Sequence, residues 1–199
     1  DGIGRYSETG FDNADPAMLI GAEAILNSAP APDGHIVLFD DDHYYLGPVL
    51  ALELVRRGHP VTLVTPQGRP CAFGGYTQEQ AGSIMQLMEA GVSIVTNQSV
   101  ETARAGEVRL GCVFTGRQTR LSCDALLPLT RRMPVTELYD ALCALPNLGP
   151  IQSVARIGDA EAPSIIAAAV HAGYRAGIDL GETVDLAARY GRREHPKLG

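Results

Sequence analysis

The sequence predicts an α/β protein in which a parallel sheet with helical crossovers is followed by a small antiparallel meander. Between residues 35 and 97, short runs of aliphatic and β-branched residues alternate with longer helical segments, as expected for parallel strands buried on both faces. From residue 99 to 122, polar and apolar residues alternate, and the turn segments RAGE and TGRQ interrupt them, which is typical of antiparallel strands. One more buried strand follows, and together these elements predict a three-layer fold.

The parallel part begins with HIVLF, an apolar run with the length and β-branched content of a buried strand. The next segment, LGPVLALELVRR, predicts a helix that ends before Gly58, a residue that suits the left-handed conformation after a helix. Its expected buried stripe consists of Leu46, Val49, Leu50 and Leu54. A second strand, VTLVT, follows, and two such parallel strands are nearly always joined by a right-handed helical crossover.

The later elements continue this order. The segment TQEQAGSIMQLMEAG predicts a helix that opens at Thr77, with Gln80 three residues on, and closes at Gly91. The third parallel strand is VSIVTN, and DALLPLT after the meander is another buried strand. The segment SVARIGDAEAPSIIAAAVHAGYRAG predicts a short strand, an acidic turn and a long helix from about Pro163.

Composition excludes several classes of partner. The 199 residues carry a formal net charge of −7, which argues against nucleic acid and acidic membranes as partners. No apolar run approaches the ~20 residues of a membrane span. No secretory signal is visible either, and we expect a cytoplasmic protein. The chain begins at Asp1 rather than at methionine, which suggests a fragment, a processed chain or a shortened one.

The four cysteines are not arranged as a metal site. Cys71, Cys112, Cys123 and Cys143 lie far apart and form no CxxC pair, so they lack the spacing of zinc or iron–sulfur ligands. We expect reduced thiols. Cys112 and Cys123 could face each other across the predicted hairpin, but we predict no disulfide between them.

The turn after the first strand has the position of a phosphate-binding turn without its residues. In GxGxxG, the first glycine makes the tight turn, the second lets the backbone approach a pyrophosphate, and the third permits close packing of helix on strand. These positions hold Asp42, Tyr44 and Gly47, so only the structural glycine is present. The second strand ends in Thr65-Pro66, without an acid for a ribose hydroxyl or an arginine for a 2′-phosphate.

The acidic run in this turn also works against an anion. Asp40, Asp41 and Asp42 place carboxylates at a helix N-terminus, whose N–H groups they can cap themselves. A pyrophosphate would approach against like charge, at a cost of roughly 1 kcal/mol or more per close pair. We therefore predict that this unit does not bind NAD(P). A metal or catalytic cluster formed with His43 is the less favoured alternative, because consecutive residues in a turn point in different directions.

Two segments together resemble the C-terminal half of the trimethylamine dehydrogenase family. They are LFDDDHYYLGPVLALELVRRGHPVTLVTP and ARIGDAEAPSIIAAAVHAGYRAG, of which the IGDAEAP turn is the most specific part. The family includes dimethylamine and histamine dehydrogenases and, more distantly, 2,4-dienoyl-CoA reductase and related NADH:flavin oxidoreductases. The resemblance covers essentially the whole chain, and it implies a Rossmann-like, glutathione-reductase-like nucleotide-binding domain with part of a second domain of the FAD/ADP type.

The resemblance divides the chain into three segments. Residues 1–32 are expected to form a connecting arm and part of the ADP/FAD-type domain, with a short helix capped by Asp15. Residues 33–130 correspond to the NAD(P)-domain-like Rossmann unit. Residues 131–199 return to the ADP/FAD-type domain and end in a basic C-terminal tail. The tail is expected to be solvated, with an acidic partner or a subunit contact as the alternative; its cations are Arg189, Arg192, Arg193 and Lys197.

The resemblance also implies where the chemistry lies. Members of the family are iron–sulfur flavoproteins with an FMN-bearing barrel before these domains, and the amine dehydrogenases pass electrons through a 4Fe–4S cluster to an electron-transferring flavoprotein. The reductase branch takes electrons from NADPH and needs an intact turn, so Asp42 and Tyr44 favour the amine dehydrogenase branch. We expect FMN and 4Fe–4S in the N-terminal part of the parent, whose barrel is a partner of this chain. We assign no catalytic residue to this chain, since His43, His59 and His171 have helix-end or packing explanations.

The expected cofactor-binding residues of this chain are Gly158, Asp159 and Ala160. In the family, the aspartate of this turn lies near the ribose–pyrophosphate region of a nucleotide, here ADP or FAD, neither of which we expect to bind firmly. Gly158 would allow close approach, and the following helix would direct its N-terminus to the same place. The alternative is that Asp159 only caps that helix. The family commonly has a second turn, Thr-Gly-Arg, and this chain has Arg131 in place of the glycine of that turn, which works against close approach to a nucleotide.

Two further readings remain open. The chain could be the corresponding part of an NADPH-dependent 2,4-dienoyl-CoA reductase-like enzyme, or a free-standing, non-catalytic interaction domain. If it is a fragment of an amine dehydrogenase, we expect an exposed apolar patch around Ile165, Ile166 and Val170. Self-association into a homo-oligomer would cover that patch.

Overall fold

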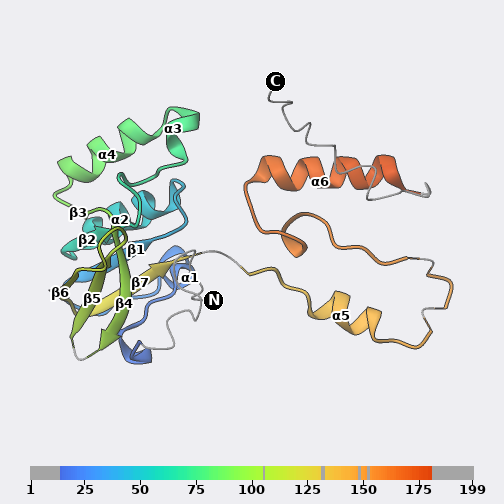
Figure 1. Cartoon of the computed structure of the whole chain (residues 1–199), viewed down its shortest axis with the longest axis horizontal. Coiled ribbons are helices and arrows are strands. Elements are labelled where there is room, and N and C mark those ends of the chain that lie inside the picture. The colour runs from blue at the N-terminus through green and yellow to red at the C-terminus, as the bar shows by residue number, and fades with distance from the viewer. Residues whose placement is uncertain (1–13, 105, 131–132, 148, 152, 181–199) are drawn as a thin grey trace, which may run out of the picture. The chain divides into compact units, whose positions relative to one another are not determined.

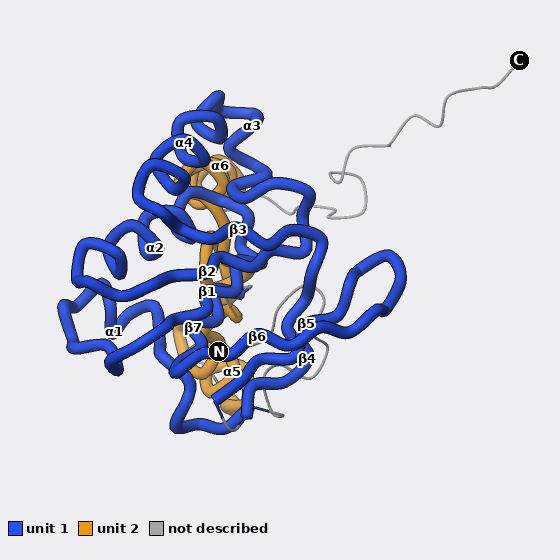
Figure 2. Tube along the Cα trace, turned by 90° about the vertical axis from the view of Figure 1, so that its left-hand side faces the viewer, with its two compact units in different colours: residues 1–132 blue, residues 133–199 orange. Residues whose placement is uncertain are grey.

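The computed structural model describes residues 14–104, 106–130, 133–147, 149–151 and 153–180. The chain forms two compact units, residues 1–132 (unit 1) and residues 133–199 (unit 2), shown in Figures 1 and 2. Unit 1 contains both sheets and the first four α-helices, and the described part of unit 2 is helical with extended links.

A four-stranded parallel sheet lies at the centre of unit 1. Its strands are β1 (Ile36–Asp40), β2 (Val61–Val64), β3 (Ser93–Val95) and β7 (Ala125–Leu129), in the order β3-β2-β1-β7. Ile36 is in register with Val61 on one side and with Ala125 on the other. All four predicted parallel strands are present, and the carboxyl ends of β1 and β7 lie side by side.

The sheet is covered on both faces, which gives the three layers that the sequence predicts. Alternate residues of β1 serve the two layers: Ile36 and Leu38 face the helices, and Val37 and Phe39 face the meander. The helices are α1 (Ala22–Leu26), α2 (Leu46–Arg56) and α4 (Gln80–Glu89). The meander consists of β4 (Gln98–Arg104), β5 (Glu107–Cys112) and β6 (Gln118–Ser122). In Figure 2 the helices, the sheet and the meander of unit 1 follow one another across the view.

The described residues before β1 are part of unit 1. Asp15 caps η1 (Pro16–Met18), a 3₁₀ turn, by accepting a hydrogen bond from the N–H of Ala17 at 3.0 Å. The sequence predicts this cap correctly, but the turn is followed by a separate helix, α1. The N–H of Ile20 donates to the carbonyl of Leu126 on β7 at 2.9 Å, and Ile25 is buried in the core beneath the helices.

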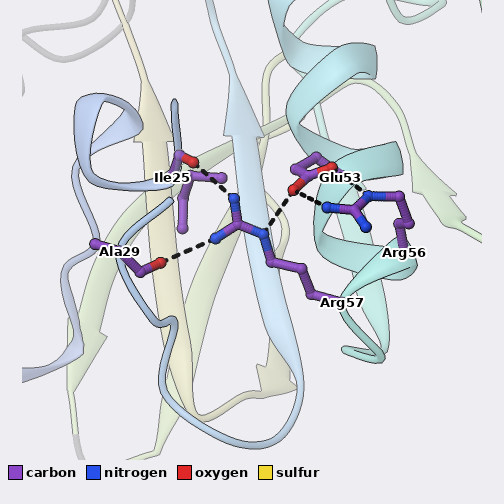
Figure 3. A network of polar contacts seen from close by, with 5 residues as sticks. All are labelled: Ile25, Ala29, Glu53, Arg56 and Arg57. Atoms are coloured by element: carbon purple, nitrogen blue, oxygen red, sulfur yellow. Dashed lines mark hydrogen bonds and ion pairs between the residues drawn. The ribbon is translucent and has the colours of Figure 1, made fainter. Parts of the chain in front are cut away.

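Arg57 fastens this segment to α2, as Figure 3 shows. Its guanidinium donates to the carbonyls of Ala29 (2.9 Å) and Ile25 (2.7 Å) and to Glu53 Oε1 (2.7 Å). Glu53 also accepts two hydrogen bonds from Arg56. The hydrogen bonds from Arg56 and then Arg57 lower the pKa of Glu53 to about 2. One side chain thus adds hydrogen bonds to two carbonyls, one in the last turn of α1 and one just after it.

Two details of the helices differ from the prediction. Val49 is 45% exposed, because Gly47, Pro48 and Ala51 join Leu50 and Leu54 on the buried side of α2. Thr77 does not open α4. It ends α3 (Gly74–Thr77), and its hydroxyl donates towards Gly74 O and Glu79 Oε2. The left-handed Gln78 separates the two helices.

The cysteines are free, and Cys112 and Cys123 do not face each other. Cys112 lies at the turn end of the β5–β6 hairpin, whereas Cys123 follows Ser122 at the opposite end, beside Glu107. Cys71 and Cys123 are buried and Cys143 is exposed. Burial raises the pKa of Cys123 to about 11. Among the helices of the described ranges, none has the length and apolar character that crossing a bilayer requires.

Unit 2 contains α5 (Glu137–Cys143), η2 (Gly158–Ala160) and α6 (Ile166–Asp179). None of its described residues is buried. The strand predicted for SVARI is wrong for this structure: the described residues 153–157 form no strand, since no neighbouring strand in the described part of unit 2 pairs with them. The long helix is present but begins at Ile166 rather than Pro163, because Ile165 is still extended.

Candidate functional site

The turn between β1 and α2 occupies the place where open α/β sheets bind ligands. It follows the carboxyl end of β1, and the N–H of Asp41 donates to Leu129 O at the end of β7, at 2.8 Å. In such sheets, ligands bind outside the carboxyl ends of the strands, where neighbouring strands connect in opposite directions. Any nucleotide of unit 1 would have to approach this turn.

Asp40 fills the space beneath the turn. The side chain is fully buried, and its Oδ1 accepts a hydrogen bond from the N–H of His43 at 3.2 Å. Burial raises the pKa of Asp40 to about 6, against the opposing effect of the His43 hydrogen bond. A Cβ at Gly47 would lie 2.6 Å from Asp40 Cγ, so any larger residue would collide with this carboxyl group. The glycine that survives from the GxGxxG pattern therefore has a packing role, as the sequence analysis expects.

The acids do not cap α2 in the way that the sequence suggests. The N-cap of α2 is Tyr45, which has no side-chain capping bond, and the hydrogen bond of Asp40 goes to His43, before the helix begins. His43 itself adopts a left-handed conformation (φ 67°) and is buried. Its Nε2 lies 3.1 Å from Asp41 Oδ1. The carboxylates of Asp40 and Asp41 thus contact His43 inside the turn instead of satisfying the helix N-terminus.

Aromatic side chains cover the turn from outside. The N–H of Phe73 donates to His43 O at 2.9 Å, and the Phe73 ring stacks on Tyr44 with centroids 5.0 Å apart and an interplanar angle of 22°. His43 and Tyr76 also contact Phe73, at 5.9 and 6.3 Å between ring centroids. The contacts of Phe73 and Tyr76 with this turn are not predictable from the sequence, where the aromatic pair in CAFGGYT is the one signal. The segment that contains them thus packs against the turn between β1 and α2.

A metal site at this turn has no support from the geometry. Across the part of the chain that the structure describes, no three His, Cys, Asp or Glu side chains gather closely enough to hold a metal ion. Asp40, Asp41 and His43 are buried within the turn itself.

The second predicted site lies in unit 2. Gly158, Asp159 and Ala160 form η2, and Asp159 Oδ1 accepts a hydrogen bond from the N–H of Ser164 at 3.3 Å. Gly158 has a left-handed backbone (φ 57°), whereas a Cβ there would meet Ala169 only at ordinary contact distance. The glycine is therefore required by its conformation more than by space. The structure brings the three residues together just before α6, whose N-cap has no side-chain capping bond.

The other candidates are dispersed. His59 follows α2, and His171 lies exposed on α6. Arg131 and the basic residues of the tail lie outside the described residues.

No family model matches the chain. Dimethylamine dehydrogenase from Hyphomicrobium sp. (strain x) is 28% identical over an alignment of 202 residues, which covers 86% of this chain and 27% of that protein.

Two solved structures share both sequence and fold with the chain. Histamine dehydrogenase from Rhizobium sp. 4-9 has a TM-score of 0.84 and 35% identity, covering 94% of this chain and 29% of that one. The 6-hydroxypseudooxynicotine amine oxidase from Pseudomonas geniculata N1 has a TM-score of 0.83 and 30% identity, covering 90% and 27%. The chain thus spans less than a third of the length of each of these three relatives.

Proposed function

Since the chain is related to the amine dehydrogenases of the trimethylamine dehydrogenase family, we propose that it is a nucleotide-domain-like module of such an oxidoreductase. Its role is structural and non-catalytic. In this proposal the parent enzyme carries out oxidative N-demethylation of an amine, and the FMN barrel and the 4Fe–4S cluster belong to the remainder of the parent. The proposed partners are that barrel and, for the parent, an electron-transferring flavoprotein.

The observation that carries the proposal is the filled turn between β1 and α2. Asp40 occupies the space beneath the turn, and Tyr44 and Phe73 stack above it. These residues do not fit the pyrophosphate of NAD(P), because the carboxylate of Asp40 would repel its negative charge and the rings of Tyr44 and Phe73 would exclude it sterically. A reductase that takes its electrons from NADPH needs this turn open. An amine dehydrogenase that passes electrons to another flavoprotein does not.

Within this proposal, Gly158, Asp159 and Ala160 supply the one nucleotide contact that the module retains. Their turn precedes the 14-residue helix α6, whose N-terminal N–H groups favour an anion. Asp159 is exposed, and its carboxylate holds the link to α6 through the N–H of Ser164. In the proposed complex this carboxylate contacts the ribose. Binding of ADP or FAD by these residues would be weak, because unit 2 buries none of its described residues.

Calorimetric titration of the 199-residue chain with NADPH, NADH and ADP tests the proposal. We expect no heat of binding with either pyridine nucleotide. Weak ADP binding that disappears in Asp159→Ala, but persists in the matched exposed variant Glu161→Ala, would locate the retained contact. Micromolar NADPH binding would contradict the non-binding turn, and it would favour the NADPH-dependent reductase instead.

A further inference from the structure

Helix α4 directs most of its apolar side chains into a hollow in unit 1 instead of into the core. Leu87 is the only buried residue of this helix. The other apolar residues of α4 recur at the spacing of one helical face, and all of them line the hollow: Ala81, Ile84, Met85 and Met88. The two methionines of this stripe are 55% and 68% exposed. The stripe therefore faces a space that no described residue fills.

The hollow has the size and the position of a small-molecule site. Its volume is about 650 Å³, within the ~300–1,000 Å³ of typical ligand pockets, and its lining is almost wholly apolar. Besides α4, it is bordered by residues 68–70 after β2, by Ile94 in β3 and by Thr96 just after β3. Open α/β sheets bind small ligands at such carboxyl ends of their strands. The hollow is separate from the filled turn between β1 and α2.

Two charged side chains line the hollow, at opposite ends of α4. The side chain of Gln80 donates to Pro70 O at 3.1 Å, which places the segment of Arg69 beside the start of the helix. Glu89 is the last residue of α4. Arg69 is exposed and makes no hydrogen bond or ion pair with any residue that the structure describes. An anionic group therefore fits at the Arg69 end of the hollow and is repelled at the Glu89 end.

The apolar stripe between these charges suits an extended chain. Met88 follows Ala81 by about two helical turns, which is ~10 Å along the helix axis and the length of a medium-chain acyl group. The flexible methionine side chains can adapt to such a chain. A nucleoside fits less well, because its base and ribose need polar partners, and Thr96 is the one uncharged polar side chain of the lining.

We propose that this hollow binds a medium-chain carboxylate, with the carboxylate on Arg69 and the methyl end at Met88. The burial of methylene groups supplies most of the affinity, and the ion pair with Arg69 sets the direction of the chain. Since the methionines leave the hollow open to solvent, the expected dissociation constant for decanoate is ~0.1–1 mM. The proposal does not depend on the role of the filled turn or of Asp159.

The four methionine methyl groups of the chain report on this site directly. In a titration of the methyl-labelled chain with decanoate followed by NMR, the signals of Met85 and Met88 are expected to shift together and to saturate. Met18, which is buried elsewhere, and Met133, which is 44% exposed in unit 2, are expected to stay unchanged. Equal shifts of Met133 and Met85 would show non-specific adsorption and overturn the proposal. The absence of any shift at ~10 mM decanoate would also overturn it.

Variants and shorter ligands test the two ends of the site separately. Arg69→Gln is expected to weaken decanoate binding ~3- to 5-fold, whereas Arg56→Gln, which alters an exposed arginine of α2, should leave it unchanged. Octanoate is expected to bind at least ~4-fold more weakly than decanoate, because it buries fewer methylene groups. Equal effects of the two arginine variants would refute the anchoring at Arg69, and equal affinities for the two acids would refute the acyl site. Larger shifts of Met85 and Met88 with 2′-AMP than with decanoate would overturn the proposal in favour of a nucleotide.

Discussion

Replacing Asp40 by asparagine is expected to stabilise unit 1 at neutral pH. Burial raises the pKa of Asp40 from 3.8 to about 6, so the folded state binds this proton more tightly than the unfolded state does. The cost of the buried charge is therefore absent below pH ~4, grows between pH ~4 and ~6, and is fully present above pH ~6. At about 1.4 kcal/mol per pKa unit, the cost reaches ~3 kcal/mol at pH 8.

Asparagine has the shape of the protonated acid and cannot ionise. Its Oδ1 can still accept the hydrogen bond from His43, but its amide adds a donor that costs ~1–3 kcal/mol if it finds no acceptor. We therefore expect Asp40→Asn to raise the free energy of unfolding by ~1–2 kcal/mol at pH 8, and to lose this advantage by pH 4. Urea unfolding followed by circular dichroism at pH 4, 6 and 8 measures the difference. The exposed Asp33→Asn is the control and should change stability by less than ~0.5 kcal/mol. An equal effect of Asp40→Asn at all three pH values would refute the buried, ionised carboxylate.

Three further outcomes follow from packing and burial. Arg57→Ala is expected to lower the free energy of unfolding by ~1–2 kcal/mol, since it removes the hydrogen bonds to Ala29 O and to Ile25 O, of which the second keeps the N–H of Ser28. The exposed Arg56→Ala should cost less than ~0.5 kcal/mol, and a similar cost for both variants in urea unfolding would contradict the network. Gly47→Ala is expected to cost ~1–3 kcal/mol, because its Cβ collides with Asp40, and an unchanged melting temperature would show that the turn relaxes. In thiol titration with Ellman's reagent at pH 8, Cys143 is expected to react at once and Cys123 only on unfolding, since burial raises the Cys123 pKa to about 11; immediate reaction of Cys123 would exclude that burial.

Most of unit 1 could be predicted from the sequence because its signals are local. Strands buried on both faces appear as unbroken apolar runs, and the glycines after α2 and α4 have the left-handed conformation that ends a helix. The stripe of α2 was predicted less well. The helical periodicity of apolar residues predicts that Val49 is buried, but Gly47 and Pro48 are buried instead. The reason is that the first turn of the helix packs on Asp40.

The rest depends on contacts that no local pattern encodes. Phe73 contacts the turn through a hydrogen bond from its N–H to the carbonyl of His43, which lies 30 positions earlier in the chain. Neither residue belongs to a repeating sequence pattern from which this contact could be predicted. The strand predicted at residues 153–157 is absent for a related reason: a strand forms only where a neighbouring strand pairs with its backbone N–H and C=O groups. The role of Asp159 lies between these cases. The sequence places it correctly before α6, and its hydrogen bond from the N–H of Ser164 holds the link to that helix without capping it.

Restoring the two missing glycines should not restore NADPH binding. The double variant Asp42→Gly/Tyr44→Gly removes the bulk of one ring and one charge from the turn, yet Asp40 remains fixed beneath it against Gly47. Phe73 also remains over it, since its hydrogen bond goes to the backbone of His43 and not to either altered side chain. We expect no NADPH binding by calorimetry in the double variant. Shortening Phe73 to alanine in the same chain removes the outer cover but not the buried carboxylate, and should still give a dissociation constant above ~1 mM. Micromolar binding by the double variant alone would show that the segment around Phe73 moves aside, and that the glycines by themselves decide whether this fold accepts a nucleotide.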